Sequence, residues 1–307
     1  MLRDFPLADR VAKHATTCFC NDLEEKPGDG AGGGPIGRIP TVEPRPAATV
    51  ALLRDAADGP EAFLLRRAAS MAFAARMHVF PGGGLDPRDL DVDPPWAGPS
   101  PSWWADALAV DEARAAGLLC AAVRELFEES GVLLAGPDSS TVVDVTDASW
   151  ECDRQALLGR TVALSELLRQ RGLLLRSDLL QPWAHWCTPL FEPRRYDTWF
   201  FVAALPEGQQ ARHVGGESDH TDWVSARAAL VQGERGDVAL MPPTQVTLEE
   251  VATFADVACV LRSPRRVRRV LPWLARLPSG DEVVIRVDLD GHGGGRPGPA
   301  SGLEVLA

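Results

Sequence analysis

Three glutamates crowd into five positions of one stretch of this chain, and residues of this type at this spacing could hold a metal ion. They are Glu125, Glu128 and Glu129, preceded by Arg124 and followed by Gly131. On a helix, with about 100° between successive residues, the three carboxylates fall within an arc of about 100°. Like charges this close repel, but Mg²⁺ or Mn²⁺ would remove the repulsion, because both ions take hard oxygen ligands and also bind phosphate oxygens. The alternative is a solvated helix face.

A glycine turn upstream favours the metal site over the solvated face. Phe80-Pro81-Gly82-Gly83-Gly84 follows directly on an apolar run that resembles a strand. Glycines at such a turn let the backbone approach a ligand or a helix closely. The two segments together could therefore form one site.

With these two segments the sequence resembles the Nudix hydrolases. The signature of that family is a glycine, five residues, a glutamate, seven residues, and then Arg-Glu-apolar-x-Glu-Glu-x-Gly-apolar. Its second half is complete here from Arg124 to Val132, and Gly82-Gly83 resembles its glycine start. Ala116 stands eight positions before Arg124, where the signature has glutamate. The first glutamate is therefore missing, or it is supplied by Glu112 or by an aspartate between the two halves.

An insertion at about residues 85–110 separates the two halves, since Arg124 follows Gly83 by 41 positions where the usual signature has 14. The first part of this insertion is rich in aspartate and proline, which predicts a long loop. A long insertion at this point is a feature of one Nudix branch, which includes the peroxisomal coenzyme A diphosphatases. The coenzyme A signature of that branch also has an arginine and a glycine between Arg67 and Phe80, where Ala72 and Arg76 stand here.

The resemblance implies both a fold and an activity. The fold is an α/β (α+β) Nudix-type α/β/α sandwich, with a mixed sheet and a long insertion before the catalytic helix. The activity is metal-dependent hydrolysis, with Mg²⁺ or Mn²⁺, of the phosphoanhydride bond in a nucleoside diphosphate linked to another moiety. Coenzyme A or acyl-coenzyme A is the first choice of substrate. The alternatives are an ADP-ribose or dinucleotide pyrophosphatase, and a catalytically inert Nudix-fold binding module.

Residues for this chemistry fall into three groups. The catalytic candidates are Arg124, Glu125, Glu128 and Glu129, and the metal-ligand candidates are the same three glutamates with Glu217. The substrate-binding candidates are Arg67, Gly82, Gly83, Arg194 and Arg195. The last two precede an aromatic strand, and guanidinium groups match phosphate oxygens, although a surface salt bridge explains them equally well.

The elements that must position these residues follow from apolar periodicity. Residues 111–130 fit the helix that carries the glutamates, with Gly131 as its left-handed cap. The other expected elements are strands at 48–53, 61–67, 198–205 and 222–224, an edge strand at 282–289, and helices at 156–171 and 247–258. Residues 1–41 are predicted to form a flexible segment, 42–290 the Nudix domain and 291–307 a frayed tail.

Composition narrows the class of partner. The chain has 307 residues, a formal net charge of −12 and no apolar run approaching 18 residues, which predicts a cytoplasmic protein without a membrane partner. The acidic balance argues against nucleic acid, because nucleic-acid binders usually present a basic face. The expected partner is a small nucleotide-type substrate, whose phosphates a bound metal would neutralise. The sequence leaves open whether the chain forms a homodimer.

Overall fold

The computed structural model describes residues 1–6, 42–69, 76–90, 94–215, 218–276, 283–290 and 305–306. The chain divides into two compact units. Unit 1 takes residues 1–45, 186–197 and 268–307, and unit 2 takes residues 46–185 and 198–267. The sequence predicted one domain over 42–290, so the separate unit 1 is a feature that it did not anticipate. Among the described residues, no helix has the length and apolar character needed to cross a membrane.

The main sheet of unit 2 follows the strand order β11-β3-β2-β10-β9, with β4 beside β3 and β5 beside β2. Its strands are β2 (Arg45–Ala56), β3 (Gly59–Arg67), β4 (His78–Val79), β5 (Gly82–Gly84), β9 (Gln181–Cys187), β10 (Tyr196–Ala204) and β11 (Ser218–Ser225). The expected hairpin is present, since β2 pairs with β3 in antiparallel fashion. Alternate residues of β2 and β3 enter the core cluster that also holds the apolar residues of α4, with Val50 and Leu52 from β2 and Phe63 and Leu65 from β3.

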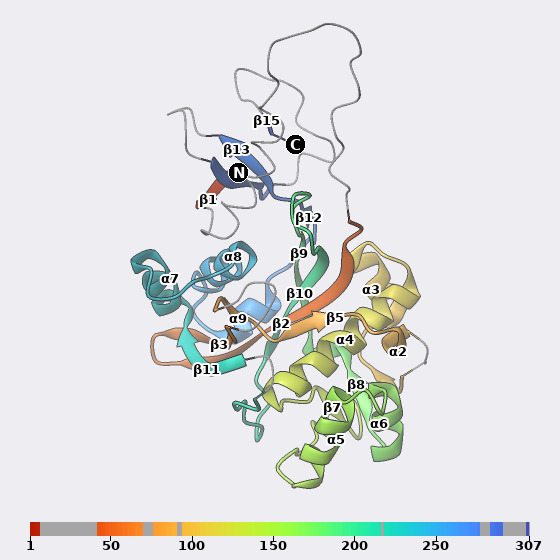
Figure 1. The fold of residues 1–307 in the computed structure, drawn as a ribbon. Helices are drawn as coiled ribbons and strands as arrows, with labels where there is room; N and C mark the ends of the chain where they lie inside the picture. The colour runs from red at the N-terminus through yellow and green to blue at the C-terminus, as the bar shows by residue number, and fades with distance from the viewer. Residues whose placement is uncertain are drawn as a thin grey trace, which may run out of the picture. The chain divides into compact units, whose positions relative to one another are not determined.

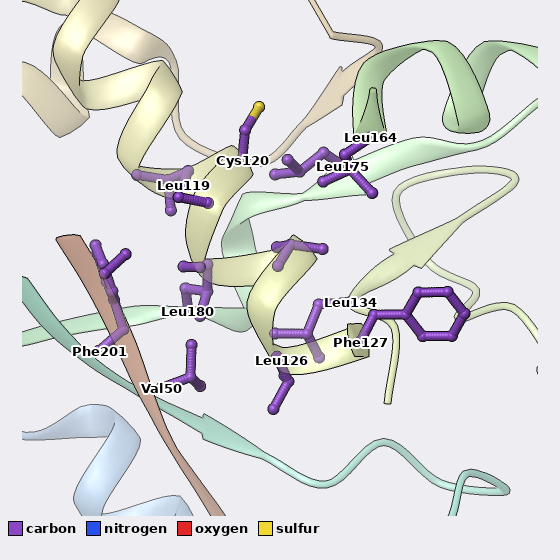
Figure 2. Packing of buried hydrophobic residues seen from close by; sticks show 14 of the residues in the cluster. Val50, Leu119, Cys120, Leu126, Phe127, Leu134, Leu164, Leu175, Leu180 and Phe201 are labelled. Atoms are coloured by element: carbon purple, nitrogen blue, oxygen red, sulfur yellow. The ribbon is translucent and has the colours of Figure 1, made fainter. Parts of the chain in front are cut away.

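Helix α4 (Glu112–Ser130) carries the three glutamates and contacts β5 (Figure 1). Asp111 caps its first turn by accepting a hydrogen bond from the Arg114 N–H at 2.8 Å. Gly131 ends it with φ 76°, so the predicted helix and its predicted left-handed cap are confirmed. Its apolar residues are buried, and Figure 2 shows Leu126 among the core residues of the sheet.

The insertion contains regular structure, so the prediction of a loop was wrong for much of it. It forms α2 (Pro87–Leu90), β6 (Trp96–Ala97) and α3 (Pro101–Leu108), and residues 91–93 lie outside the described part of the chain. Ser100 caps α3 and Pro101 is its first residue, where the missing proline N–H needs no partner. Trp104 of α3 is fully buried against Phe201 at a ring-centroid distance of 5.9 Å. The proline therefore starts a helix here instead of preventing one.

Two predicted helices are each divided in two. In place of a helix at 156–171 there are α5 (Ser149–Leu158) and α6 (Leu164–Arg171), because Arg160 adopts φ 57° and turns the chain after Gly159. In place of a helix at 247–258 there are α8 (Pro242–Val251) and α9 (Val257–Arg262), the second capped by Asp256. The remaining elements of unit 2 are β7 (Ala135–Gly136), β8 (Leu174–Arg176), the 3₁₀ turn η1 (Ser177–Leu179) and α7 (Ala226–Arg235). Helix α7 contacts β3, β11 and α8 (Figure 1).

Unit 1 contains a separate sheet with the strand order β1-β14-β13-β15. Its strands are β1 (Leu2–Pro6), β13 (Trp273–Arg276), β14 (Val283–Asp288) and β15 (Val305–Leu306), and unit 1 also holds the short strand β12 (Arg269–Val270). The strand predicted at the edge is therefore central, since β14 pairs with both β1 and β13. Its second partner comes from residues 2–6, inside the segment predicted to be flexible. The rest of that segment, and most of the predicted tail, lie outside the described residues.

Candidate active site

The glycine turn lies directly against the carboxylates of α4. The Gly82 N–H donates a hydrogen bond to Glu129 Oε2 at 2.8 Å. A Cβ added at Gly83 would lie 2.4 Å from Glu125 Oε1, so a side chain at this position would displace that carboxylate. Strand β5 holds the turn in place by pairing with β2. The structure thus brings together the two segments that stand far apart in the sequence.

Arg124 is buried beside these carboxylates and is bound by acceptors on several sides. Its Nε and Nη2 donate to the two carboxylate oxygens of Asp89 at 3.1 and 2.9 Å. Nη2 also donates to the Gly84 carbonyl at 3.0 Å, and Nη1 donates to Glu125 Oε1 at 2.8 Å. Arg124 and Asp89 are only 6% and 5% exposed, so each charge depends on the other for compensation. The pair therefore joins α2 of the insertion to α4.

Asp89 is the residue that sequence reasoning did not single out. The sequence offered Glu112 or an aspartate of the insertion as the source of the missing acidic group. Glu112 is exposed in the first turn of α4, whereas Asp89 accepts two hydrogen bonds from Arg124. Five residues separate Gly83 from Asp89, which is the spacing between the glycine and the first glutamate of the Nudix signature. Counting forward from Gly83 would have found Asp89, while counting back from Arg124 led to Ala116.

The positive charge of Arg124 does not fully compensate the carboxylates of Glu125 and Glu128. Burial raises the pKa of Glu125 and of Glu128 above the usual glutamate range, and the nearby Arg124 guanidinium only partly opposes this by lowering it. A divalent cation would supply further positive charge, and the oxygen donors are of the kind that Mg²⁺ and Mn²⁺ prefer. The donor set therefore fits such an ion chemically.

Arg124 and the glycine turn set the positions of these carboxylates. Glu125 and Glu128 point to Arg124, with Nη1 at 2.8 Å from Glu125 and 3.4 Å from Glu128, while Glu129 is held by the glycine turn. Within the described ranges, no group of three or more His, Cys, Asp or Glu side chains converges on a common metal position. Glu217, the fourth predicted ligand, lies outside the described residues. To share an ion, Glu125 and Glu128 must turn away from Arg124.

Comparisons with known proteins agree with this geometry. Residues 105–251 match the family model described as the NUDT19 Nudix domain. The chain is 25% identical over 265 residues to the acyl-coenzyme A diphosphatase NUDT19 of Xenopus laevis, covering 72% of this chain and 68% of the relative. It is 27% identical over 282 residues to the human protein of the same name, covering 75% and 73%. A crystal structure of a Nudix hydrolase from Alicyclobacillus acidocaldarius superposes with a TM-score of 0.61 and 28% identity, covering 73% of this chain and 98% of that one. These matches support the prediction of a Nudix hydrolase.

The similarity confirms the predicted α/β Nudix fold and supports an enzyme that cleaves a pyrophosphate bond. Nudix hydrolases act on small nucleotide-linked substrates and generally need divalent metal ions. The alternative of a catalytically inert module is thereby set aside.

The expected substrate-binding arginines have different surroundings. Arg67 ends β3 and is paired with Ser218 of β11, the residue that follows Glu217 in the sequence. Arg194 is exposed in unit 1. Arg195 is 6% exposed, and its guanidinium donates to the carbonyls of residues 42, 188 and 189 at 2.8, 3.0 and 3.1 Å. These backbone acceptors give Arg195 a structural role within unit 1.

A second buried arginine anchors the C-terminal turn of α4. Arg154 of α5 is 2% exposed and donates from Nη1 to the backbone carbonyl of Glu128 at 2.7 Å. Glu151 neutralises Arg154 by accepting from its Nε at 3.0 Å and its Nη2 at 2.5 Å. A cation at the end of a helix also compensates the unpaired carbonyls there. Arg154 therefore helps to fix the position of Glu128 through its backbone.

Proposed function

We propose that this protein cleaves the diphosphate bond of coenzyme A or an acyl-coenzyme A, with Mg²⁺ or Mn²⁺ held by Glu125, Glu128 and Glu129. The observation that carries the proposed site is the contact of the glycine turn with the carboxylates, with Gly82 N 2.8 Å from Glu129 Oε2. The choice of substrate is supported by the two relatives named acyl-coenzyme A diphosphatase, and by the insertion after the glycine turn.

Each protein group has a distinct part in this proposal. A divalent ion in such a site neutralises charge on the phosphoryl oxygens and activates water. Glu125, Glu128 and Glu129 bind the ion, and Glu217 is retained as a proposed fourth ligand. Arg124 holds the carboxylates in place and does not touch the substrate, because its donors are taken up by protein acceptors.

Asp89 takes the place of the first glutamate of the Nudix signature in this proposal. It is a positioning residue, because it is 5% exposed and acts on the carboxylates only through Arg124. Gly82 and Gly83 let the backbone of the turn lie close to the phosphates. Arg67 and the exposed Arg194 remain proposed phosphate ligands, since guanidinium groups match phosphate oxygens.

The proposal also includes a cytoplasmic location and no nucleic-acid or membrane partner. These expectations rest on composition alone. The sequence does not decide between a monomer and a homodimer. Light scattering on the purified full chain measures the oligomeric state directly, and it requires no knowledge of the substrate.

A substrate panel tests the proposed reaction. The full chain is incubated with coenzyme A, acetyl-coenzyme A, ADP-ribose, a diadenosine polyphosphate and a nucleoside triphosphate, each with Mg²⁺ and with Mn²⁺, and products are identified by mass. We expect coenzyme A and its thioester to give adenosine 3′,5′-bisphosphate and the corresponding phosphopantetheine. Faster turnover of ADP-ribose or the dinucleotide would replace the proposed substrate with the alternative one and leave the metal site standing.

A further inference from the structure

Arg76 is an arginine in a backbone conformation that favours glycine. Its φ is +64°, and the other described non-glycine residues with positive φ are Ala109 and Arg160. Ala109 is the left-handed C-cap of α3, and Arg160 follows Gly159, the C-cap of α5, so both lie where a helix ends. Arg76 stands two residues before β4, in the connection from β3. A residue held in such a conformation is a reason to examine what its side chain does.

Strands β3 and β4 connect Arg76 to the candidate active site. The Arg76 N–H donates to the Arg67 carbonyl at 2.9 Å, and the Arg67 N–H donates to the Met77 carbonyl at 3.0 Å. The chain then runs through β4 to Gly82, which binds Glu129. Gly82 follows Arg76 by six positions, so their α-carbons are at most roughly 22 Å apart. A single nucleotide-type molecule bound at the carboxylates can therefore reach the Arg76 side chain.

The Arg76 guanidinium is exposed and makes no hydrogen bond or ion pair with any described residue. Two arginines of the neighbouring strands are neutralised: Arg54 of β2 binds Glu61 at 2.7 Å, and Arg66 of β3 binds Asp219 at 2.6 Å. A positive charge without a partner among the described residues is notable in a chain with a formal net charge of −12. It is suited to a negatively charged part of the ligand.

We propose that Arg76 binds a phosphomonoester of the substrate, a phosphate group other than the two of the bond that is cleaved. The inference rests on the proposed function of the carboxylate site. A phosphomonoester carries nearly two negative charges near neutral pH, and a guanidinium donates two parallel hydrogen bonds to its oxygens. Arg76 thereby selects nucleoside diphosphate compounds that bear an additional phosphate, such as coenzyme A, over those that lack one, such as ADP-ribose.

The test compares two matched pairs of ligands in the full chain. Coenzyme A and 3′-dephospho-coenzyme A are the substrates for kinetics, and adenosine 3′,5′-bisphosphate and AMP are the ligands for calorimetry. In the Arg76→Gly variant we expect KM for coenzyme A to rise about ten- to hundredfold, the range of a hydrogen-bonded ion pair, with KM for the dephospho compound unchanged. Binding of the bisphosphate should weaken by a similar factor, while AMP binding stays the same.

A second variant separates loss of the guanidinium from relief of backbone strain. Both Arg76→Gly and Ala109→Gly replace a left-handed residue by glycine, so each should keep or raise the Tm of the protein. Only Arg76→Gly should change the preference for the extra phosphate. An equal effect of Arg76→Gly on both members of each pair, or no effect on either, overturns the inference. If the wild-type chain cleaves neither coenzyme A compound, the proposed substrate fails, and the calorimetric pair still decides the role of Arg76.

Discussion

Asp89 and Arg124 form a buried ion pair that joins the insertion to the helix of the three glutamates. The closest N–O distance is 2.9 Å, and the two residues are 35 positions apart in the sequence. Arg124 in turn donates to Glu125, so the carboxylate of Asp89 helps to set the position of a proposed metal ligand without touching the ion. The insertion is therefore part of the framework of the candidate active site.

Replacing Asp89 by asparagine should destabilise the protein and impair turnover together. The substitution leaves the buried Arg124 charge poorly compensated, and breaking a buried ion pair typically costs about 3–5 kcal/mol. Urea unfolding measures this loss, and steady-state kinetics with coenzyme A measures the loss of kcat. Glu112→Gln is the matched control, because Glu112 is the exposed alternative on α4 and its loss should change stability by about 0.5 kcal/mol or less. If Glu112→Gln proves the more damaging variant, Asp89 is not the replacement for the first glutamate.

Glu128→Gln should lower kcat by about 10²–10⁴ if this carboxylate both binds the metal and handles protons. The amide keeps the shape of the side chain but removes its negative charge, so calorimetric titration should also show weaker Mn²⁺ binding. Glu234→Gln on the exposed part of α7 is the control and should behave as the wild type in both measurements. Turnover near the wild-type rate in saturating Mg²⁺ would remove Glu128 from the proposed machinery.

The sequence predicted the parts of the fold whose causes are local. Helix α4 was expected within one residue, because its apolar spacing and both of its caps lie inside one segment. The glycine turn and the glutamates were recognised for the same reason. By contrast, the division of the predicted helix at 156–171 depends on Arg160 adopting φ 57°, a conformation that arginine rarely takes.

Features that depend on distant partners could not be predicted in this way. The composition of the insertion indicated a loop, but Trp104 is buried against Phe201 of β10, and that contact stabilises α3. Likewise, the alternation at 282–289 indicated an edge strand, because nothing near it in the sequence shows that residues 2–6 pair with it. The Asp89–Arg124 pair belongs to the same class, although the spacing from Gly83 carried a usable signal.

Glu151→Gln should reduce stability at neutral pH and lose this effect in acid. Hydrogen bonds from Arg154, and then from Gln155 and Arg212, lower the pKa of Glu151 from 4.5 to about 2. A carboxyl whose pKa is lowered on folding stabilises the protein above its unfolded pKa, and this contribution is lost as pH falls toward the folded value. The variant should therefore be less stable than the wild type by about 1 kcal/mol at pH 7, since Glu151 is partly exposed to solvent and screened.

The stability difference between wild type and Glu151→Gln should shrink between pH 4.5 and about 2, the two pKa values of the carboxyl. Urea unfolding at pH 7, 4 and 3 measures it. Glu166→Gln, which removes an exposed glutamate bonded to Gln170 on α6, is the control and should leave the stability at pH 7 close to that of the wild type. A difference that stays constant across this range would mean that the charge of Glu151 is not what stabilises Arg154.

Gly83→Ala should damage activity more than stability, and Gly84→Ala should damage neither. An added Cβ at Gly83 would lie 2.4 Å from Glu125 Oε1 and 2.5 Å from its carboxyl carbon, whereas one at Gly84 has no atom within 4 Å. The Glu125 side chain is flexible and can move away, so the free energy of unfolding should change little. The displaced carboxylate, however, leaves the position proposed for metal binding, and a shift of about 1 Å in an active site can lower the rate about 10²-fold. Steady-state kinetics and urea unfolding of the two variants test this directly. The two substitutions are the same and lie one residue apart, so they differ mainly in whether the added Cβ meets Glu125. Equal kcat values for the two variants would show that the close approach of Gly83 to Glu125 has no part in the reaction.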